Sequence, residues 1–284
     1  PVVIFAATNK SIVQSSLFFY MKYMFPLFLL FIILLRPDAY GFYLIPIAFL
    51  LLFFPALTTR SKILLLVATT VVLVADLGAR SSIIKFGVPL LIVIIYYLRN
   101  KIPSNIFEIM RLSLFILPLL FFSLGVSGIF NVFNMKEYIK KDITTTAIDN
   151  RGNMVEQDMR TDTRTFIYEE VLESAIDNNY WLLGRTPARG NDSFTFGVYA
   201  YDLTGRNERL ANEVGLANIF TWTGVVGVLL YTLIFFRASF LAVNRSKNTY
   251  VKLLGIYISF RWLFAWIEDI SDVSLNYFMI MTMI

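Results

Sequence analysis

The sequence predicts an all-α, polytopic membrane protein: a transmembrane helical bundle of about eight spans, with one large extracytoplasmic loop that contains an amphipathic helix. Two observations carry this prediction. Hydrophobic residues make up 57% of the 284 positions and charged residues only 16%, against about 25% charged residues in a typical soluble domain. Long apolar runs recur along the chain, except in one polar stretch at residues 131–213.

The residue types that are missing narrow the chemistry. The chain has no cysteine, which excludes a disulfide framework and a thiolate metal site. It also has no histidine, the commonest general base and metal ligand. Acid–base chemistry must therefore use Asp, Glu, Lys, Tyr or groups of the substrate, and we expect neither a metal nor a cofactor. We interpret the net charge of +5 by its location along a membrane protein, not as a sign of nucleic-acid binding.

Apolar runs that approach transmembrane length define the spans, because about 20 apolar residues cover the hydrocarbon core of a bilayer. The predicted spans are 17–35, 42–57, 63–75, 83–98, 112–130, 214–236, 251–267 and a last one from Leu275. The chain begins at Pro1 and stops within that last run, so we expect a fragment of a longer protein. The predicted organisation is transmembrane helices at 1–130, the large loop at 131–213 and truncated C-terminal transmembrane helices at 214–284.

The distribution of lysine and arginine orients the chain, because cytoplasmic loops carry an excess of basic residues. With the 131–213 loop outside, the inside loops hold Lys10, Arg60, Lys62, Arg99, Lys101, Arg111, Arg237, Arg245, Lys247 and Lys252. The short outside turns hold only Arg36 and Arg80, beside the acidic Glu268, Asp269 and Asp272. This bias predicts a periplasmic or extracellular loop. Lys85 follows Arg80 by little more than one helical turn, so both could serve one outward-facing cavity.

The large loop has its own pattern. Residues 131–161 are polar and predict an irregular segment, whereas 164–180 predict an amphipathic helix. The apolar residues of that helix recur at helical spacing and are Phe166, Ile167, Val171, Leu172, Ala175 and Ile176. Asp162 or Thr163 could cap its N-terminus. We expect Glu169, Glu170 and Glu173 to form a solvated face.

Two polar segments after this helix are candidate binding elements. Residues 181–193 hold Gly, Pro and the arginines Arg185 and Arg189, and the arginine fork suits phosphate oxygens; the alternative is a structural turn with surface arginines. At the loop exit, Asn212 and Glu213 lie at the outer mouth of the next span. Asn212 could instead be an N-cap, and Glu213 could serve the helix dipole.

Three short motifs follow one another along the chain. The first is Ala79-Arg80-Ser81-Ser82, which opens a span. The second is Asp162-Thr163-Arg164 followed by Trp181 and Leu183-Gly184. The third is Asn212-Glu213 followed by Thr223-Gly224-Val225-Val226-Gly227. In this order they resemble the O-antigen polymerase and O-antigen ligase superfamily of bacterial envelope enzymes. The ligases usually have a histidine near the loop exit, and its absence here favours a polymerase.

The resemblance implies a metal-independent, inverting glycosyltransferase of the bacterial inner (cytoplasmic) membrane, with its large loop in the periplasm. The donor would be an oligosaccharide on undecaprenyl diphosphate, and the acceptor would be the non-reducing end of another lipid-linked repeat. The partners implied are this lipid-linked oligosaccharide, the lipid bilayer and a chain-length regulator protein, with no nucleic acid.

The chemistry of such a reaction selects the candidate site residues. A diphosphate leaving group needs preorganised cations, and an acceptor hydroxyl needs a base. The candidate catalytic residues are Glu213 as the base, with Arg164 and Arg80 as cations. The candidate diphosphate- or glycan-binding residues are Lys85, Arg185, Arg189, Arg206, Arg209 and Asn212. Weaker candidates are Asp162 and Glu208 as bases, and Trp181, Tyr180, Tyr199 and Tyr201 as platforms for sugars.

Three other functions stay open at this stage. A ligase would transfer finished glycan to lipid A core or protein. A transporter or flippase would show internal repeats and interrupted helices, and would have a cavity open to the cytoplasm lined by Lys22 and Arg261. A membrane scaffold would not explain the arginine-rich loop.

Overall fold

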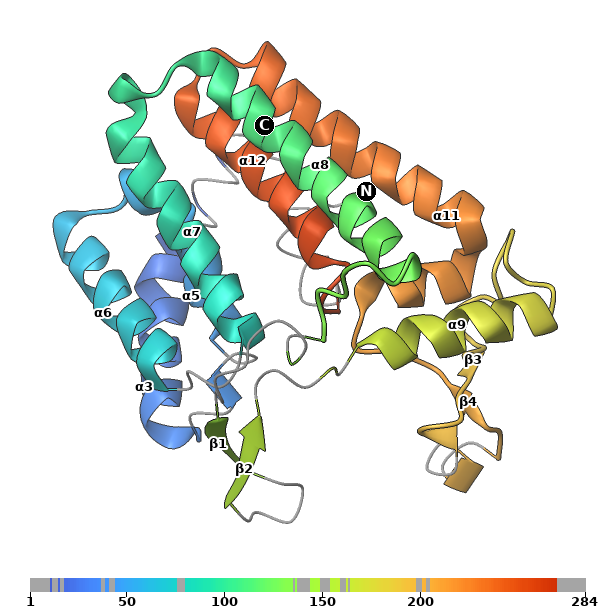
Figure 1. Cartoon of the computed structure of the whole chain (residues 1–284). Coiled ribbons are helices and arrows are strands. Elements are labelled where there is room, and N and C mark those ends of the chain that lie inside the picture. Colours follow the sequence, from blue (N-terminus) through green and yellow to red (C-terminus); the bar gives the residue numbers. More distant parts are fainter. Residues whose placement is uncertain are drawn as a thin grey trace.

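The computed structural model shows a mostly helical protein (Figure 1). The structure describes residues 11, 15, 18–36, 39–40, 44–75, 80–134, 136, 144–148, 154–158, 162, 164–197, 201–202 and 205–269. The helices are η1 (Tyr20–Met24, a π-helix), α3 (Phe25–Leu34), α5 (Ile45–Leu51), η3 (Phe54–Ala56), α6 (Thr59–Ala75), α7 (Arg80–Leu98), η4 (Arg99–Lys101), α8 (Ser104–Val126), α9 (Thr165–Asp177), α11 (Gly215–Phe240), η6 (Leu241–Arg245, a π-helix) and α12 (Thr249–Phe264). The strands are β1 (Thr144–Ile148), β2 (Met154–Asp158), β3 (Asn191–Asp192) and β4 (Glu208–Arg209).

Helices α8, α11 and α12 pack together and form the larger apolar core (Figure 1). Phe235 of α11 and Trp262 of α12 are fully buried in it, with their ring centroids 6.1 Å apart. The outer faces of these helices stay apolar and exposed, as at Leu119, Leu229 and Leu233. An apolar exterior around an apolar core is expected where lipid is the solvent.

Within the described residues, three helical segments are long and apolar enough to cross a membrane. They are Ile83–Lys101, Asn105–Val126 and Gly215–Arg245. They coincide with the predicted spans at 83–98, 112–130 and 214–236. The membrane class of the protein therefore rests on these three segments.

The other predicted spans have shorter helices or fall outside the description. The spans 17–35, 63–75 and 251–267 contain η1 with α3, α6 and α12, which are each below transmembrane length in the described residues. The span from Leu275 lies outside the described residues. These segments therefore do not by themselves establish a membrane crossing.

The prediction for residues 42–57 was wrong in form. This stretch holds only the short helix α5, followed by a one-turn 3-10 helix with Pro55 near its start. Leu44, Ile47 and Leu50 are completely buried in a second core formed with α3, α6 and α7. A short helix that is apolar on every side is typical of a buried core helix, and apolar composition alone does not distinguish it from a short span.

Short basic turns lie at one end of the bundle, which we call the basic end, and the 131–213 region lies at the other (Figure 1). The short turns between α7 and α8 and between α11 and α12 carry Arg99, Lys101, Arg245 and Lys247. The region 131–213 emerges from the opposite end. At the basic end, Arg111 is buried and joins α8 to α11, because it bonds Glu108 and lies 3.4 Å from the Ser239 hydroxyl.

The 131–213 region is more ordered than the sequence predicts. Strands β1 and β2 pair antiparallel inside the segment that we expected to be irregular. A second antiparallel pair, β3 with β4, joins the turn after α9 to the exit of the region. The all-α prediction is therefore correct for the bundle but not for this region, where two short antiparallel strand pairs form.

Candidate functional site

Helix α9 begins at Thr165, and the side chain of Asp162, one of the two predicted capping residues, bonds its first backbone N–H groups. Thr163, the other candidate, lies outside the described residues. Asp162 Oδ1 accepts hydrogen bonds from the backbone N–H groups of Arg164 and Thr165, each at 3.0 Å. Burial raises the pKa of Asp162, but hydrogen bonds from Thr165, Arg164 and Asn131 outweigh it and hold the pKa below its ordinary value. Asp162 is thus a structural carboxylate, and its cap places Arg164 at the mouth of the site.

The buried face of α9 differs from the predicted one. Ile167, Val171 and Ala175 are buried as expected, whereas Leu172 and Ile176 are exposed. Two polar residues, Glu170 and Ser174, complete the buried face at the same helical spacing. The prediction of a solvated Glu170 was therefore wrong, while Glu169 and Glu173 are exposed.

Glu170 is buried because it organises the loop that follows β3. Its carboxylate accepts hydrogen bonds from the hydroxyls of Ser193 and Thr195, each at 2.7 Å, and from the backbone N–H groups of Phe194 and Thr195 at 3.1 and 2.8 Å. Burial raises the pKa of Glu170, but these hydrogen bonds outweigh it and lower the pKa below its ordinary value. A buried carboxylate with this many donors is a structural support for the loop.

We expect Glu170→Ala to destabilise this loop by about 3 kcal/mol, because it leaves buried donors without an acceptor. Hydrogen exchange at the amides of Phe194 and Thr195 would report the change directly. Glu173→Ala, on the exposed face of the same helix, is the matched control and should leave exchange unchanged. Equal protection of these amides in both variants would contradict the assigned role.

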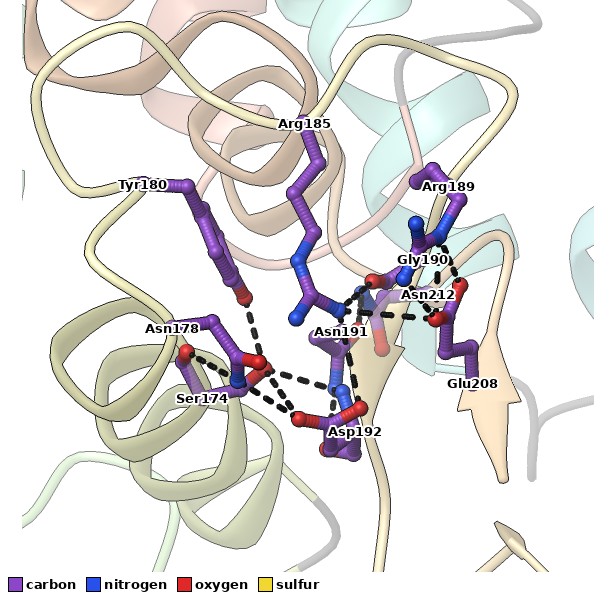
Figure 2. Close-up of polar contacts among 10 residues, drawn as sticks. All are labelled: Ser174, Asn178, Tyr180, Arg185, Arg189, Gly190, Asn191, Asp192, Glu208 and Asn212. Atoms are coloured by element: carbon purple, nitrogen blue, oxygen red, sulfur yellow. Dashed lines mark hydrogen bonds and ion pairs between the residues drawn. The ribbon is translucent and has the colours of Figure 1, made fainter. Parts of the chain in front are cut away.

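The side chain of Arg185 lies inside the loop network (Figure 2). Its guanidinium carbon lies 4.5 Å from the ring centroid of Tyr180, and its Nη1 donates to the Gly190 carbonyl at 2.9 Å. Asp192 and Glu208 carboxylate oxygens are 3.5 and 3.8 Å from the same nitrogen. Arg185 thus ties the turn at 181–193 to both strands of the β3–β4 pair.

The side chain of Arg189 belongs to the same network (Figure 2). Its Nε lies 3.0 and 2.8 Å from the two carboxylate oxygens of Glu208, and its Nη2 also bonds that carboxylate. These hydrogen bonds lower the pKa of Glu208 below its ordinary value, although burial opposes the change. The close packing at Gly190, where an added Cβ would lie 2.0 Å from the Arg209 carbonyl oxygen, fixes the turn against β4. The placement of Arg185 and Arg189 favours the structural turn over diphosphate binding.

Asn212 is buried at the loop exit and does not cap α11. Its side-chain amide donates to Asn191 Oδ1 at 2.9 Å, and its backbone N–H donates to Asn218 Oδ1 at 2.5 Å. The segment that follows α12 instead accepts hydrogen bonds from the first N–H groups of α11, because the Gly215 N–H donates to the Glu268 carbonyl at 2.9 Å. Asn212 therefore links the loop to α11 from the interior.

The loop docks on α11 at a break in that helix. Gly224 has φ 64° and ψ −167°, so α11 consists of two helical arms that meet there. Across the break, the N–H groups of Arg185 and Thr186 donate to the carbonyls of Thr221 and Trp222, and those of Val225 and Val226 donate to the carbonyls of Trp181 and Leu182, at 2.7–3.2 Å. The loop backbone thereby replaces hydrogen bonds that the break removes from the helix.

Gly184 and Gly224, which belong to the second and third sequence motifs, both lie where the loop packs against α11. An added Cβ at Gly184 would lie 2.3 Å from the Thr223 nitrogen, and one at Gly224 would lie 2.2 Å from the Leu182 carbonyl oxygen. Both glycines also have positive φ, which favours glycine. The Leu183-Gly184 and Gly224-Val225 motifs therefore have a packing explanation in this chain.

A cavity of about 630 Å³ lies between the outer half of α8, the start of α9 and the end of α12. Its walls are mainly apolar and aromatic, with Phe121, Phe122 and Trp266 among them. Arg164, Glu169 and Glu268 are its charged lining residues. Such a cavity suits an apolar ligand that carries a charged group.

A cluster of charges lies beside this cavity, and we call it the rim cluster: Lys85, Arg164, Arg209, Glu213 and Glu268. Lys85 Nζ is 3.7 Å from Glu268, and Arg164 Nη2 is 3.9 Å from the same carboxylate. Arg164 also bonds Glu213, whose other oxygen lies 3.7 Å from Arg209 Nη2. Lys85 is only 4% exposed, whereas Glu213 is 56% exposed. The rim cluster thus holds three cations and two carboxylates, of which Glu268 is half-buried and Glu213 is exposed. Arg164 and Glu268 connect it to the apolar cavity.

Further donors in the rim cluster suit it to bind an anion. Arg164 Nε donates to the Ile267 carbonyl at 3.2 Å, which fixes the guanidinium against the end of α12. Arg209 lies 4.4 Å from the ring centroid of Phe196, and its buried Nη1 has no hydrogen-bond partner among the described residues. Two positioned guanidinium groups and one ammonium group can together receive a diphosphate.

The structure brings together Lys85, Arg164, Arg209 and Glu213 from the predicted set. Arg80 begins α7, the helix that carries Lys85, but its side chain lies outside the description. Arg206 is exposed on a turn and does not line the cavity. Tyr201 is exposed, Tyr180 and Trp181 belong to the docking region, and Tyr199 lies outside the described residues.

Sequence reasoning missed two residues of the site. Glu268 was counted only as an acidic residue of an outer turn, and its position next to a predicted span was the available signal. Tyr168 lines the cavity and donates its hydroxyl to the Trp266 carbonyl at 2.7 Å. Burial raises the pKa of Tyr168, so this hydroxyl stays protonated and serves as a fixed donor.

Comparison of the chain with protein-family models, with curated proteins and with solved structures gave no match. The fold and the site therefore define only a class, a helical membrane protein with an apolar cavity and a cationic rim.

Proposed function

We propose that this protein is an integral-membrane glycosyltransferase that polymerises undecaprenyl-diphosphate-linked oligosaccharide repeats. In this proposal the protein crosses the bacterial inner membrane several times and keeps residues 131–213 in the periplasm. The product is the repeating glycan of an O-antigen, capsule or exopolysaccharide. The observation that carries the proposal is the rim cluster at the mouth of an apolar cavity.

The two parts of the site match the two parts of the proposed donor. The apolar walls of the cavity suit a polyprenyl chain, which must be kept from water. The guanidinium and ammonium groups of Arg164, Arg209 and Lys85 suit the diphosphate at the headgroup level. A soluble sugar nucleotide would not need an apolar cavity next to its phosphate site, so the combination favours a lipid-linked donor.

The proposed reaction is an inverting displacement at the anomeric carbon of the donor. An acceptor hydroxyl oxygen forms the new bond to this carbon as the bond to the diphosphate oxygen breaks. Arg164, Lys85 and Arg209 stabilise the charge that develops on the leaving diphosphate. Glu213, the exposed carboxylate of the rim cluster, takes the hydroxyl proton. In the absence of ligand Glu213 is held by Arg164 and Arg209, so the diphosphate must displace it from these arginines before it can act as a base.

The distribution of charge supports the proposed sidedness. The turns that carry Arg99, Lys101, Arg245 and Lys247 lie at the end opposite the 131–213 region (Figure 1). Short loops rich in lysine and arginine stay on the cytoplasmic side. This distribution supports the proposal that the rim cluster faces the periplasm, where lipid-linked repeats are presented after they cross the membrane.

Inactivation of the gene distinguishes this function from its alternatives. Loss of a polymerase should reduce long surface glycan to single capped repeats, because one repeat is still made and transferred. Loss of a ligase would instead leave long glycan attached to the lipid carrier, and loss of a flippase would leave single repeats on the cytoplasmic face. The measurement is gel separation of surface and lipid-linked glycan, and either of the latter two patterns would refute a polymerase.

A further inference from the structure

Three consecutive apolar side chains stand exposed where the loop docks on α11. The side chains of Trp181, Leu182 and Leu183 are all exposed, and that of Leu183 is 70% exposed. They lie in a well-defined turn between α9 and β3. Exposed apolar side chains that gather in this way on an ordered turn indicate a surface that something covers.

The backbone of this turn forms hydrogen bonds with α11. Such bonding is needed for any irregular segment that enters a membrane. The carbonyls of Trp181 and Leu182 accept from Val225 and Val226 at 2.9 and 3.2 Å, and the Gly184 N–H donates to the Tyr180 carbonyl at 2.7 Å. Chain that is neither helix nor barrel is tolerated at membrane depth only where neighbouring protein satisfies its polar groups. The close approach of Gly184 to α11 provides this arrangement.

The exposed turn continues the lipid-facing surface of α11. Val225 and Val226, which bond the turn through their N–H groups, are themselves exposed. Leu229, Leu230 and Leu233 extend the same exposed apolar surface toward the basic end of the bundle. This helix belongs to a segment that is long and apolar enough to cross a membrane, so whatever covers its outer face also reaches the turn.

The break at Gly224 sets the depth of the turn. At about 1.5 Å per residue, the arm from Val225 to Arg245 is roughly 30 Å long, which equals the hydrocarbon thickness of a bilayer. Gly224 therefore lies at one boundary of the hydrocarbon core when Arg245 lies at the other. Trp181 then falls at the interface, where tryptophan is enriched in membrane proteins.

We propose that residues 181–183 insert into the leaflet on the side of the 131–213 region, as a non-spanning anchor that binds the lipid surface. The anchor holds the loop and its β3–β4 pair against the bilayer. It thereby keeps the rim cluster level with the lipid headgroups. This anchor does not depend on the glycosyltransferase proposal, because any reaction on a membrane lipid would gain from it.

The absence of cysteine makes a direct test straightforward. Leu183→Cys, Leu229→Cys and Asn207→Cys, made in the full chain, are labelled with bimane and reconstituted in phosphatidylcholine–phosphatidylglycerol vesicles. Leu229 is exposed on α11 and is the lipid control, while Asn207 is exposed on the polar turn before β4 and is the water control. All three positions are exposed, so the substitutions should leave the fold intact.

Quenching identifies what covers residue 183. With a doxyl group on the lipid acyl chain near the headgroup, Leu183→Cys should be quenched as strongly as Leu229→Cys and several-fold more than Asn207→Cys. With iodide in the water, the order should reverse. Iodide quenching of Leu183→Cys at the level of Asn207→Cys would overturn the proposal. Protection of Leu183→Cys from both quenchers would also overturn it, because a second protein surface would then cover the turn.

Discussion

Replacing Arg164 with alanine should slow glycan chain growth by about 10²–10³-fold, the usual cost of removing one preorganised charge-stabilising donor. Arg164 lines the cavity and contacts both carboxylates of the rim cluster, Glu213 and Glu268. Without it, Lys85 and Arg209 lack the cation between them. The measurement is the distribution of chain lengths made in a strain that carries the variant, where we expect single capped repeats to predominate.

Two further variants separate chemistry from folding in this experiment. Arg164→Lys keeps the positive charge but loses the planar fork, so activity should fall to an intermediate level. Arg245→Ala removes an exposed arginine at the opposite end of the bundle and should leave chain length unchanged. Protein amount and thermal stability in detergent must stay comparable among the variants. Normal chain lengths in Arg164→Ala at a normal protein level would refute the proposed site.

Gly224→Ala and Gly184→Ala should each detach the loop from α11 and destabilise the protein by more than about 4 kcal/mol. Each added Cβ would lie within 2.4 Å of backbone atoms on the facing segment, and backbone cannot rotate away as a side chain can. Positive φ adds about 1–2 kcal/mol of strain for any residue other than glycine. Thermal unfolding in detergent and proteolysis of the 181–186 turn would both report the loss.

Gly205→Ala is the matched control for Gly184→Ala and Gly224→Ala. Gly205 also has positive φ, at 70°, but no described atom lies within 4 Å of the position that its Cβ would take. The substitution therefore costs only the conformational strain of about 1–2 kcal/mol. If Gly184→Ala were no more harmful than Gly205→Ala, close backbone packing would not be what holds the loop on α11.

The pairing of the loop arginines shows why a charged motif is a poor guide to a binding site by itself. Arg185 and Arg189 had the residue type and the glycine-rich setting of a phosphate site. Their partners, Asp192 and Glu208, come from strands that pair only after the chain folds back on itself. Arg164 carried a weaker local pattern, yet its position at the cap of α9 places it on the cavity.

The buried face of α9 has a similar explanation. Apolar spacing located the helix within a few residues of its true ends and correctly placed Ile167 and Val171 inside. Glu170 lies on the same face. From the sequence alone a glutamate is predicted to be solvated, because the groups that donate hydrogen bonds to its carboxylate are not known. Those donors come from residues up to 25 positions later in the chain, so local periodicity had no information about them.

By itself, the sequence determined the membrane class of the protein and the helices at 83–98, 112–130 and 214–236, because an apolar run meets lipid in the same way whatever surrounds it. It also predicted Asp162 and Thr163 as the two candidate caps of α9, because a cap acts on its immediate neighbours. Only the tertiary structure decided which charges meet. Glu268 joins Arg164 across about a hundred residues of chain. Gly184 packs against the backbone of Trp222 and Thr223, and Gly224 packs against that of Leu182. Ion pairs and backbone contacts depend on distances in space, and spacing along the chain does not encode them.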